Sequence, residues 1–185
     1  MRAFFVQYAH MMKRSIPFAL SQDIFEIPPE FYLSLGIKAV LVDLDNTLDP
    51  YVVSSPSDRT IEWKEKMAKA GLRIVILSNN SGGRVGKYAG ELGVEARFLM
   101  RKPFAGPLKK FLKEEGLSKD EAILVGDQIQ TDVLAANGAG VRVILTEPLY
   151  HEEPPWTKFN RIFDRPKRKR IKAKHLAPYW KEVLP

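Results

Sequence analysis

The sequence predicts an α/β protein in which a parallel sheet is covered by helices on both faces. Short runs of apolar and β-branched residues alternate along the chain with segments of helical periodicity, and glycines follow most of those segments. This alternation is typical of parallel strands that are joined by helical crossovers. The 185 residues are enough for one domain with a sizeable hydrophobic core.

The first half of the pattern contains two strands and two helices. The apolar runs at 38–43 and 73–77 predict buried strands. Between them, residues 57–70 predict a helix, because a serine suits its start, apolar residues recur at helical spacing and a glycine follows its end. Residues 84–92 predict a second, shorter helix that a glycine also ends.

The second half repeats this order with shorter and less regular segments. The remaining predicted elements are a strand at 95–100, a helix at 105–115, a strand at 122–125, a helix at 130–137 and a strand at 141–145.

The chain divides into three segments. Residues 37–147 hold the predicted α/β core, residues 1–36 form an N-terminal segment expected to pack on or near it, and residues 148–185 form a basic, aromatic extension. Residues 158–185 contain ten Lys or Arg and two acidic residues, a net charge of +8, whereas the rest has 19 basic and 20 acidic residues, a net charge of −1. A basic segment with aromatic residues suits an anionic lipid surface or a nucleic acid, and a solvated, partly disordered tail is the alternative.

The N-terminal segment has one apolar helical face. That face could lie in a membrane interface, although packing on the protein's own sheet is the favoured interpretation. Its members are Phe4, Phe5, Tyr8, Met11 and Met12.

Composition excludes several kinds of site. The chain has no cysteine, which excludes disulfides, thiolate metal sites and a cysteine nucleophile, and its three histidines are far apart. No run approaches the ~20 apolar residues that span a bilayer, so no transmembrane segment is expected. The N-terminus is a poor signal peptide. We therefore expect a cytoplasmic protein, with peripheral attachment to the inner face of the membrane as a further expectation.

Polar side chains follow four of the predicted strands directly. In parallel sheets ligands bind at the carboxyl ends of the strands, so these side chains are expected to converge. They are Asp43 and Asp45, then Ser78 and Asn79, then Lys102, and finally Asp127 with Asp132. Each group alone has an ordinary reading as a turn or a surface residue, but four in succession favour a site. Asp49, beside Pro50, is predicted to form only a turn.

The residue types indicate phosphoryl transfer. Clustered carboxylates without His or Cys favour Mg²⁺ as the cation between them. Asp43 and Asp45 are two apart in an extended chain and can address the same site, Asp43 as nucleophile and Asp45 as general acid and base. Ser78, Asn79 and Lys102 are the expected phosphate-binding residues, with Lys102 supplying the positive charge.

The motifs resemble those of the haloacid dehalogenase (HAD) superfamily. DLDNTL at 43–48, Ser78 in LSNN, Lys102 in RKP and GDQIQTD at 126–132 are similar to its four motifs in order. The resemblance implies a Rossmann-like fold and a phosphatase that forms an aspartyl-phosphate. An aspartate at the position of Asp45 is similar to the phosphatases, whereas the related pump ATPases carry threonine there.

The resemblance also implies residue roles. Asp43 would be the nucleophile, and Asp45 would be the general acid and base. The metal ligands would be Asp43, Asp45 through its backbone carbonyl, and Asp127. Asp132 would not bind the metal directly but would orient water or Lys102. The cofactor implied is Mg²⁺.

A closer resemblance covers roughly residues 20–165. This stretch resembles the YqeG-type phosphatases of HAD subfamily IIIA, which are similar to the phosphatidylglycerophosphate phosphatases of mitochondria and plastids. That family implies a lipid phosphomonoester as the substrate.

The spacing of the motifs leaves no room for a cap domain. The 32 residues between Asp45 and Ser78 and the 23 residues between Ser78 and Lys102 are nearly filled by predicted elements. An open site suits a phosphate presented on a large object such as a membrane, a nucleic acid or a protein, and an oligomer partner could also roof it.

Three functional hypotheses remain open. The leading one is a Mg²⁺-dependent phosphomonoester hydrolase that acts on phosphatidylglycerophosphate at an anionic membrane surface, in phospholipid biosynthesis. The second is a HAD phosphatase of a soluble metabolite, such as a nucleotide or sugar phosphate. The third is a non-enzymatic RNA-binding module that uses the basic extension, which the complete set of catalytic residue types disfavours. The sequence does not indicate the oligomeric state.

Overall fold

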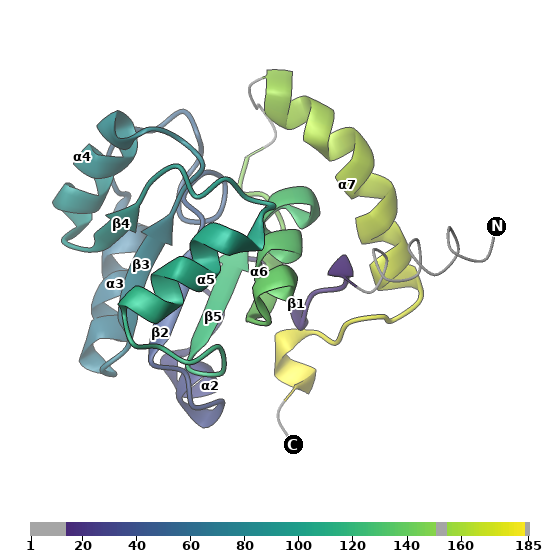
Figure 1. Cartoon of the computed structure of the whole chain (residues 1–185), viewed down its shortest axis with the longest axis horizontal. Helices are drawn as coiled ribbons and strands as arrows, with labels where there is room; N and C mark the ends of the chain where they lie inside the picture. Colours follow the sequence, from purple (N-terminus) through teal and green to yellow (C-terminus); the bar gives the residue numbers. More distant parts are fainter. Residues whose placement is uncertain (1–13, 151–154, 184–185) are drawn as a thin grey trace.

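The computed structural model describes residues 14–150 and 155–183, and for residues 155–161 and 163 it describes the backbone only (Figure 1). Its centre is a six-stranded sheet in the order β1-β6-β5-β2-β3-β4, in which every neighbouring pair is parallel. The strands are β1 (Ala19–Ser21), β2 (Ala39–Val42), β3 (Arg73–Leu77), β4 (Glu95–Arg97), β5 (Ala122–Gly126) and β6 (Arg142–Thr146). The predicted α/β fold is confirmed.

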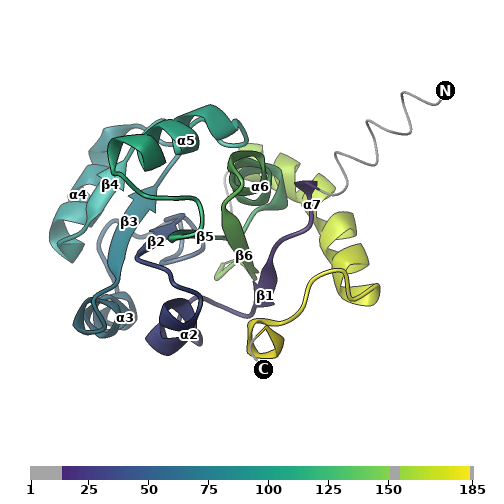
Figure 2. The same ribbon diagram turned by 60° about the horizontal axis from the view of Figure 1, so that its bottom comes forward.

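Helices cover both faces of the sheet (Figures 1 and 2). Side chains of α2 (Pro29–Ser34), α3 (Asp58–Lys69) and α4 (Gly82–Leu92) share one buried cluster. Side chains of α5 (Ala105–Glu114) and α6 (Leu134–Ala139) belong to the other.

The strands feed both clusters because successive side chains point to opposite faces. In β2, Val40 and Val42 belong to the first cluster and Leu41 to the second.

The helix boundaries follow local chemistry. Helix α3 begins after Ser57, whose Oγ accepts a hydrogen bond of 3.3 Å from the backbone N–H of Thr60. Helix α4 ends at Gly93, where the chain takes a φ of 70° that favours glycine.

The register aligns the carboxyl ends of the three central strands. Val42, the last residue of β2, pairs with Ile76 of β3 and with Val125 of β5. The residues that follow these strands therefore emerge at one edge of the sheet, which is where the functional residues were expected to meet.

Two predicted elements differ most from the structure. β4 ends at Arg97 rather than at 100, because Leu99 and Arg101 take left-handed backbone conformations with φ of 52° and 50°. The helix predicted at 130–137 is instead a π-helical turn, η1 (Ile129–Val133), that continues into α6.

The N-terminal segment supplies an edge strand that the sequence did not predict. β1 pairs with β6, and Ala19 lies opposite Ile144. The far side of β1 meets the end of the chain, since the backbone N–H of Leu20 donates a hydrogen bond of 2.8 Å to the carbonyl of Pro178. The apolar face predicted at residues 4–12 lies outside the described residues.

The basic extension is folded. It forms α7 (Pro155–Ala173) and a short 3₁₀ turn, η2 (Trp180–Glu182). Ile171 and Trp180 are both buried in the core clusters. The alternative prediction of a solvated, partly disordered tail is therefore wrong for the described part of this extension.

No cap domain separates the sheet edge from solvent between residues 46 and 101, where the chain forms only α3, α4, strands and loops. Across the described residues, none of the helices is both long enough and apolar enough to span a membrane.

Candidate active site

Lys102 lies at the centre of the candidate site. Its Nζ is 2.6 Å from Asp43 Oδ1 and 2.7 Å from Asp132 Oδ1, and it donates a third hydrogen bond, of 2.9 Å, to the carbonyl of Leu77. All three ammonium donors are thus satisfied. Because only 8% of Lys102 is exposed, this cation is fixed rather than mobile.

Burial and charge oppose each other at this pair. Burial raises the pKa of Asp43 well above its usual range, against the lowering effect of Lys102, and the carboxylates of Asp132, Asp127 and Asp45 raise it further. Burial alone would lower the pKa of Lys102, but the carboxylates of Asp132 and Asp43 together raise it above its usual value. The ammonium therefore stays charged, and the surplus of carboxylates favours a further cation.

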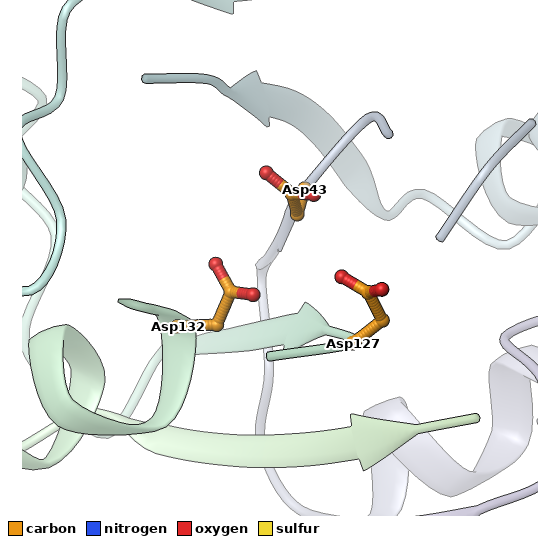
Figure 3. A group of neighbouring side chains, drawn as sticks. All are labelled: Asp43, Asp127 and Asp132. Carbon is orange, nitrogen blue, oxygen red and sulfur yellow. The ribbon is translucent and has the colours of Figure 1, made fainter. Parts of the chain in front are cut away.

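Three carboxylates converge at the carboxyl ends of β2 and β5 (Figure 3). One carboxylate oxygen from each of Asp43, Asp127 and Asp132 lies within 4.8 Å of the others. All three residues are buried. A donor set made only of carboxylate oxygens fits Mg²⁺, which prefers hard oxygen ligands.

Asp132 is held by the protein on both oxygens. Oδ1 accepts the hydrogen bond from Lys102, and Oδ2 accepts one of 3.1 Å from the backbone N–H of Gln128. Asp132 therefore lies where it can orient Lys102. Its predicted role in orienting Lys102 or water stays a prediction.

Gly126 makes room for this arrangement. A Cβ atom at Gly126 would lie 2.4 Å from Asp132 Cγ, a separation that atoms do not tolerate. The glycine of GDQIQTD is therefore a packing requirement of the carboxylate cluster.

Asp45 is turned toward α4. Its Oδ1 forms an ion pair with Arg84 Nη2, and its Oδ2 accepts a hydrogen bond of 2.8 Å from Asn80 Nδ2. Burial raises the pKa of Asp45, and the hydrogen bond and charge of Arg84 oppose that rise. Arg84 also donates to the carbonyl of Val53 at 3.1 Å. The sequence analysis missed Arg84, although a cation near the start of the helix after LSNN could have indicated it.

Ser78 and Asn79 organise the loop beside Lys102. Ser78 is buried, and its Oγ accepts a hydrogen bond of 3.1 Å from the backbone N–H of Asn80. The Asn79 side chain donates to the carbonyl of Lys102 at 2.9 Å and accepts from the Lys102 N–H at 2.7 Å. Asn79 thus fixes the backbone of Lys102, and its predicted phosphate contact stays a prediction.

Asp49 has a larger part than the predicted turn. It is buried, and its Oδ2 accepts hydrogen bonds from Tyr88 Oη, from Thr60 Oγ1 at 2.9 Å and from the Ser57 N–H at 3.1 Å. The loop after Asp43 is therefore anchored to α3 and α4, and the prediction of a simple turn is wrong.

The helix α7 holds the loop that follows β5. Asp164 is buried, and its carboxylate accepts hydrogen bonds from the N–H groups of Ile129 at 2.9 Å and Gln130 at 3.1 Å. One turn later, Arg168 donates to the carbonyl of Asp127 at 2.7 Å and to that of Thr146 at 2.9 Å.

The sequence analysis missed these contacts. The sequence feature that could have indicated them is Asp164, an acidic residue within a basic segment. It precedes Arg168 by four residues, so both side chains lie on the same face of a helix.

Comparisons with known proteins show which proteins this chain is similar to. Residues 5–150 match the family described as "Mitochondrial PGP phosphatase". The chain is 33% identical over 155 residues to "Probable phosphatase YqeG" of Bacillus subtilis (strain 168), covering 84% of this chain and 90% of that protein.

A plant relative matches over a smaller share of its length. The chain is 31% identical over 151 residues to "Phosphatidylglycerophosphate phosphatase 1, chloroplastic/mitochondrial" of Arabidopsis thaliana. The match covers 76% of this chain and 43% of that protein, so this chain spans less than half of the plant relative.

Among solved structures, an uncharacterized protein from Listeria monocytogenes serotype 4b shares the fold. The TM-score is 0.53 at 20% identity, and the match covers 64% of this chain and 85% of the other. Asp164 and Arg168 lie beyond residues 5–150, outside the family match.

Proposed function

The chain belongs to the mitochondrial PGP phosphatase family and is a phosphatase of the haloacid dehalogenase type, and from this membership we propose that it hydrolyses phosphatidylglycerophosphate through an aspartyl-phosphate on Asp43. The observation that carries the proposal is the convergence of Asp43, Asp127 and Asp132 around the buried ammonium of Lys102. This arrangement provides a nucleophile, a fixed cation and a place for Mg²⁺ at the open edge of the sheet.

The first chemical step uses Asp43 as the nucleophile. Its carboxylate attacks phosphorus, and the bond from phosphorus to the alcohol oxygen breaks. Asp45 gives the leaving oxygen its proton, for which its carboxyl group turns from Arg84 toward Asp43. Lys102 and Ser78 hold the phosphoryl oxygens during the transfer.

The second step releases phosphate. Asp45 takes a proton from water, the water oxygen attacks the phosphorus bound to Asp43, and the Asp43 carboxylate is regenerated. Mg²⁺, held by Asp43, Asp127 and the carbonyl of Asp45, would offset the negative charge that the phosphate brings to these carboxylates. Asp132 keeps Lys102 in place throughout.

Two features support a lipid as the substrate. A curated relative carries that activity in its name, and the family description does too. The site also lacks a cap between residues 46 and 101, so a head group can reach Asp43 while its acyl chains stay in a bilayer.

The basic face of α7 supports attachment to an anionic membrane. Arg165, Lys169, Arg170 and Lys174 are exposed. By contrast, Arg168 and Lys172 are engaged by Glu147, at 3.0 Å and 2.8 Å. Four exposed cations can attract anionic lipid at ~1 kcal/mol each. Peripheral attachment on the cytoplasmic face of a membrane is part of this proposal.

A phosphate-release panel tests the function. The purified protein is assayed with Mg²⁺ on micellar phosphatidylglycerophosphate, glycerol 3-phosphate, a nucleoside monophosphate, a sugar phosphate and an aryl phosphate. The lipid is expected to give the highest kcat/KM, and Asp43→Asn serves as the inactive control. A wide preference for one of the soluble esters would replace the lipid with a metabolite, and no release from any ester would leave an RNA-binding module to test.

A further inference from the structure

The loops around the candidate site expose unusually large apolar side chains. Phe104 is 71% exposed, Val52 65% and Leu99 60%. In the described part of the chain, only Ile162 of α7, at 64%, is comparable among large apolar residues. Large exposed apolar side chains that gather around one site mark a binding surface more often than single exposed residues do.

Hydrogen bonds link the loops that carry Val52 and Leu99 to the partners of Asp45, and this side of the site is called its entrance. Val52 precedes Val53, whose carbonyl accepts from Arg84, the partner of Asp45. The N–H of Leu99 donates to the carbonyl of Asn80 at 3.3 Å, and the Asn80 side chain also contacts Asp45.

Phe104 completes the surface on the side of Lys102, which it follows by two residues. Its N–H donates to the carbonyl of Arg101 at 2.9 Å. The three apolar side chains thus come from two loops, at 50–56 and at 98–104, that both contact residues of the candidate site.

The charge of these loops suits an anionic surface. The chain has 22 acidic residues, but none falls in the loops at 50–56, 78–81 and 98–104. The same loops carry the exposed Arg101 and the buried Lys102. An apolar rim with cations and without carboxylates fits the boundary between lipid head groups and acyl chains, where aliphatic and aromatic side chains insert beside basic ones.

The first half of α7 extends this surface. Figure 1 shows α7 beginning beyond the carboxyl ends of the strands, at the top of the view. Ile162 and Arg165, both exposed, come before Arg168, which reaches Asp127. The start of α7 therefore lies on the same side of the molecule as the carboxyl ends of the strands.

We propose that Val52, Leu99 and Phe104 form a docking rim that inserts into an anionic lipid bilayer and seats the entrance of the site on it. The inference rests on the proposed lipid substrate and deepens it. Asp43 is only 9% exposed, so a head group can reach it only if the entrance lies against the membrane. Apolar insertion fixes that orientation, which charge attraction alone does not.

Site-specific labelling tests insertion directly. Because the chain has no cysteine, Phe104→Cys gives a single attachment point for an environment-sensitive nitrobenzoxadiazole dye. Leu33→Cys is the matched control, since Leu33 is also exposed, at 47%, but belongs to α2, at the opposite end of the sheet (Figure 1). Vesicles of phosphatidylcholine and phosphatidylglycerol should brighten and blue-shift the dye at 104 and leave the dye at 33 unchanged.

A second measurement links insertion to turnover. The triple variant Val52→Ser, Leu99→Ser, Phe104→Ser should lower kcat/KM for phosphatidylglycerophosphate in vesicles by about tenfold or more. Burying even one large apolar side chain in the bilayer strengthens binding by at least about tenfold, and the variant removes three such side chains. Its turnover of a soluble aryl phosphate should change far less. Leu33→Ser should match the wild type on both substrates.

The outcomes separate the rim from the proposed function. Absence of a dye response at 104, or an equal response at 33, overturns the rim even if the lipid is hydrolysed. A dye response at 104 together with no hydrolysis of the lipid retains the rim and rejects the proposed substrate. Equal losses of the triple variant on lipid and aryl phosphate assign these side chains to the site itself and overturn the rim.

Discussion

Arg168 of α7 donates a hydrogen bond of 2.7 Å to the carbonyl oxygen of Asp127, whose side chain joins the carboxylate cluster. A helix that lies beyond the family match thereby fixes the backbone of a proposed metal ligand. Groups that hydrogen-bond to metal ligands commonly affect how tightly the metal is bound.

Replacing Arg168 should therefore weaken Mg²⁺ binding. Arg168→Gln removes the hydrogen bond to Asp127, and the Mg²⁺ concentration for half-maximal phosphate release should rise by about 10-fold or more. Turnover at saturating Mg²⁺ should fall less. Lys169→Gln, at an exposed neighbouring position, is the control, and an unchanged Mg²⁺ requirement in Arg168→Gln would show that α7 does not position Asp127.

Asp43 should be indispensable for turnover. Asp43→Asn keeps the shape of the side chain but removes the nucleophile, so phosphate release should disappear while thermal unfolding stays cooperative. Excess chelator should likewise stop the wild-type enzyme, and Mg²⁺ should raise its Tm because a ligand of the folded state stabilises it. Full turnover by Asp43→Asn, or in chelator, would overturn the mechanism.

Asp45 should matter most for poor leaving groups. Asp45→Asn removes the general acid and should slow release from an alkyl phosphate by ~10²–10⁴. An aryl phosphate needs less protonation of its leaving oxygen and should suffer less. The measurement is kcat on both esters, and an equal loss would assign Asp45 a structural or metal-holding role.

Glu147 should make α7 docking sensitive to acid. Burial raises the pKa of Glu147, but Arg168 and Lys172 lower it more, so its net pKa lies below the usual value. The stabilisation of the folded state by the ion pairs of Glu147 is therefore fully present above about pH 4.3, the pKa of a glutamate in the unfolded chain. It is lost as the pH falls through the lower pKa that Glu147 has in the folded protein. Glu147→Gln should lower Tm by about 1–4 °C at pH 7, for a loss of about 0.5–1 kcal/mol.

The difference between Glu147→Gln and the wild type should shrink below about pH 4. Thermal unfolding at both pH values measures it. A difference that stays constant with pH would show that the ion pairs of Glu147 do not contribute.

The exposed cations of α7 should govern attraction to membranes. Changing Arg165, Lys169, Arg170 and Lys174 together to glutamine should weaken vesicle sedimentation and reduce its salt dependence, because screening acts over only ~8 Å at physiological ionic strength. Activity on a soluble aryl phosphate should persist. Binding that ignores both salt and vesicle charge would exclude this attraction.

Substitution is a sharper test here than truncation. Deleting residues 166–185 would also remove Arg168, the buried Ile171 and the buried Trp180. Such a deletion should lower activity on every substrate, whatever the membrane contributes.

The sequence predicted the central sheet because its signals are local and strong. β3 was predicted with its observed boundaries, since the apolar run at 73–77 is bounded by polar residues and a glycine turn. The order of polar residues after the strands likewise indicated Asp43, Lys102, Asp127 and Asp132 as neighbours, because parallel register brings those positions to one edge.

The remaining elements depend on distant contacts. β1 has only three residues, and its pairing with β6 involves residues more than a hundred positions away. The basic sequence of α7 suggests a solvated segment because it contains many cations. Asp164, Arg168 and Ile171, which contact the rest of the protein, are a minority among its residues. Arg84 is one cation among many, and only the fold brings it to Asp45.

The contact between the β1 segment and Tyr179 has a consequence for biosynthesis. The N–H of Gln22, just after β1, donates a hydrogen bond of 2.9 Å to Tyr179 Oη, 157 positions later. Translation proceeds from the N-terminus, so β1 emerges first and waits with unpaired edges until β6 and finally Tyr179 are made. A nascent chain that ends before Tyr179 would already contain every proposed catalytic residue but would lack the side chain that contacts the β1 segment.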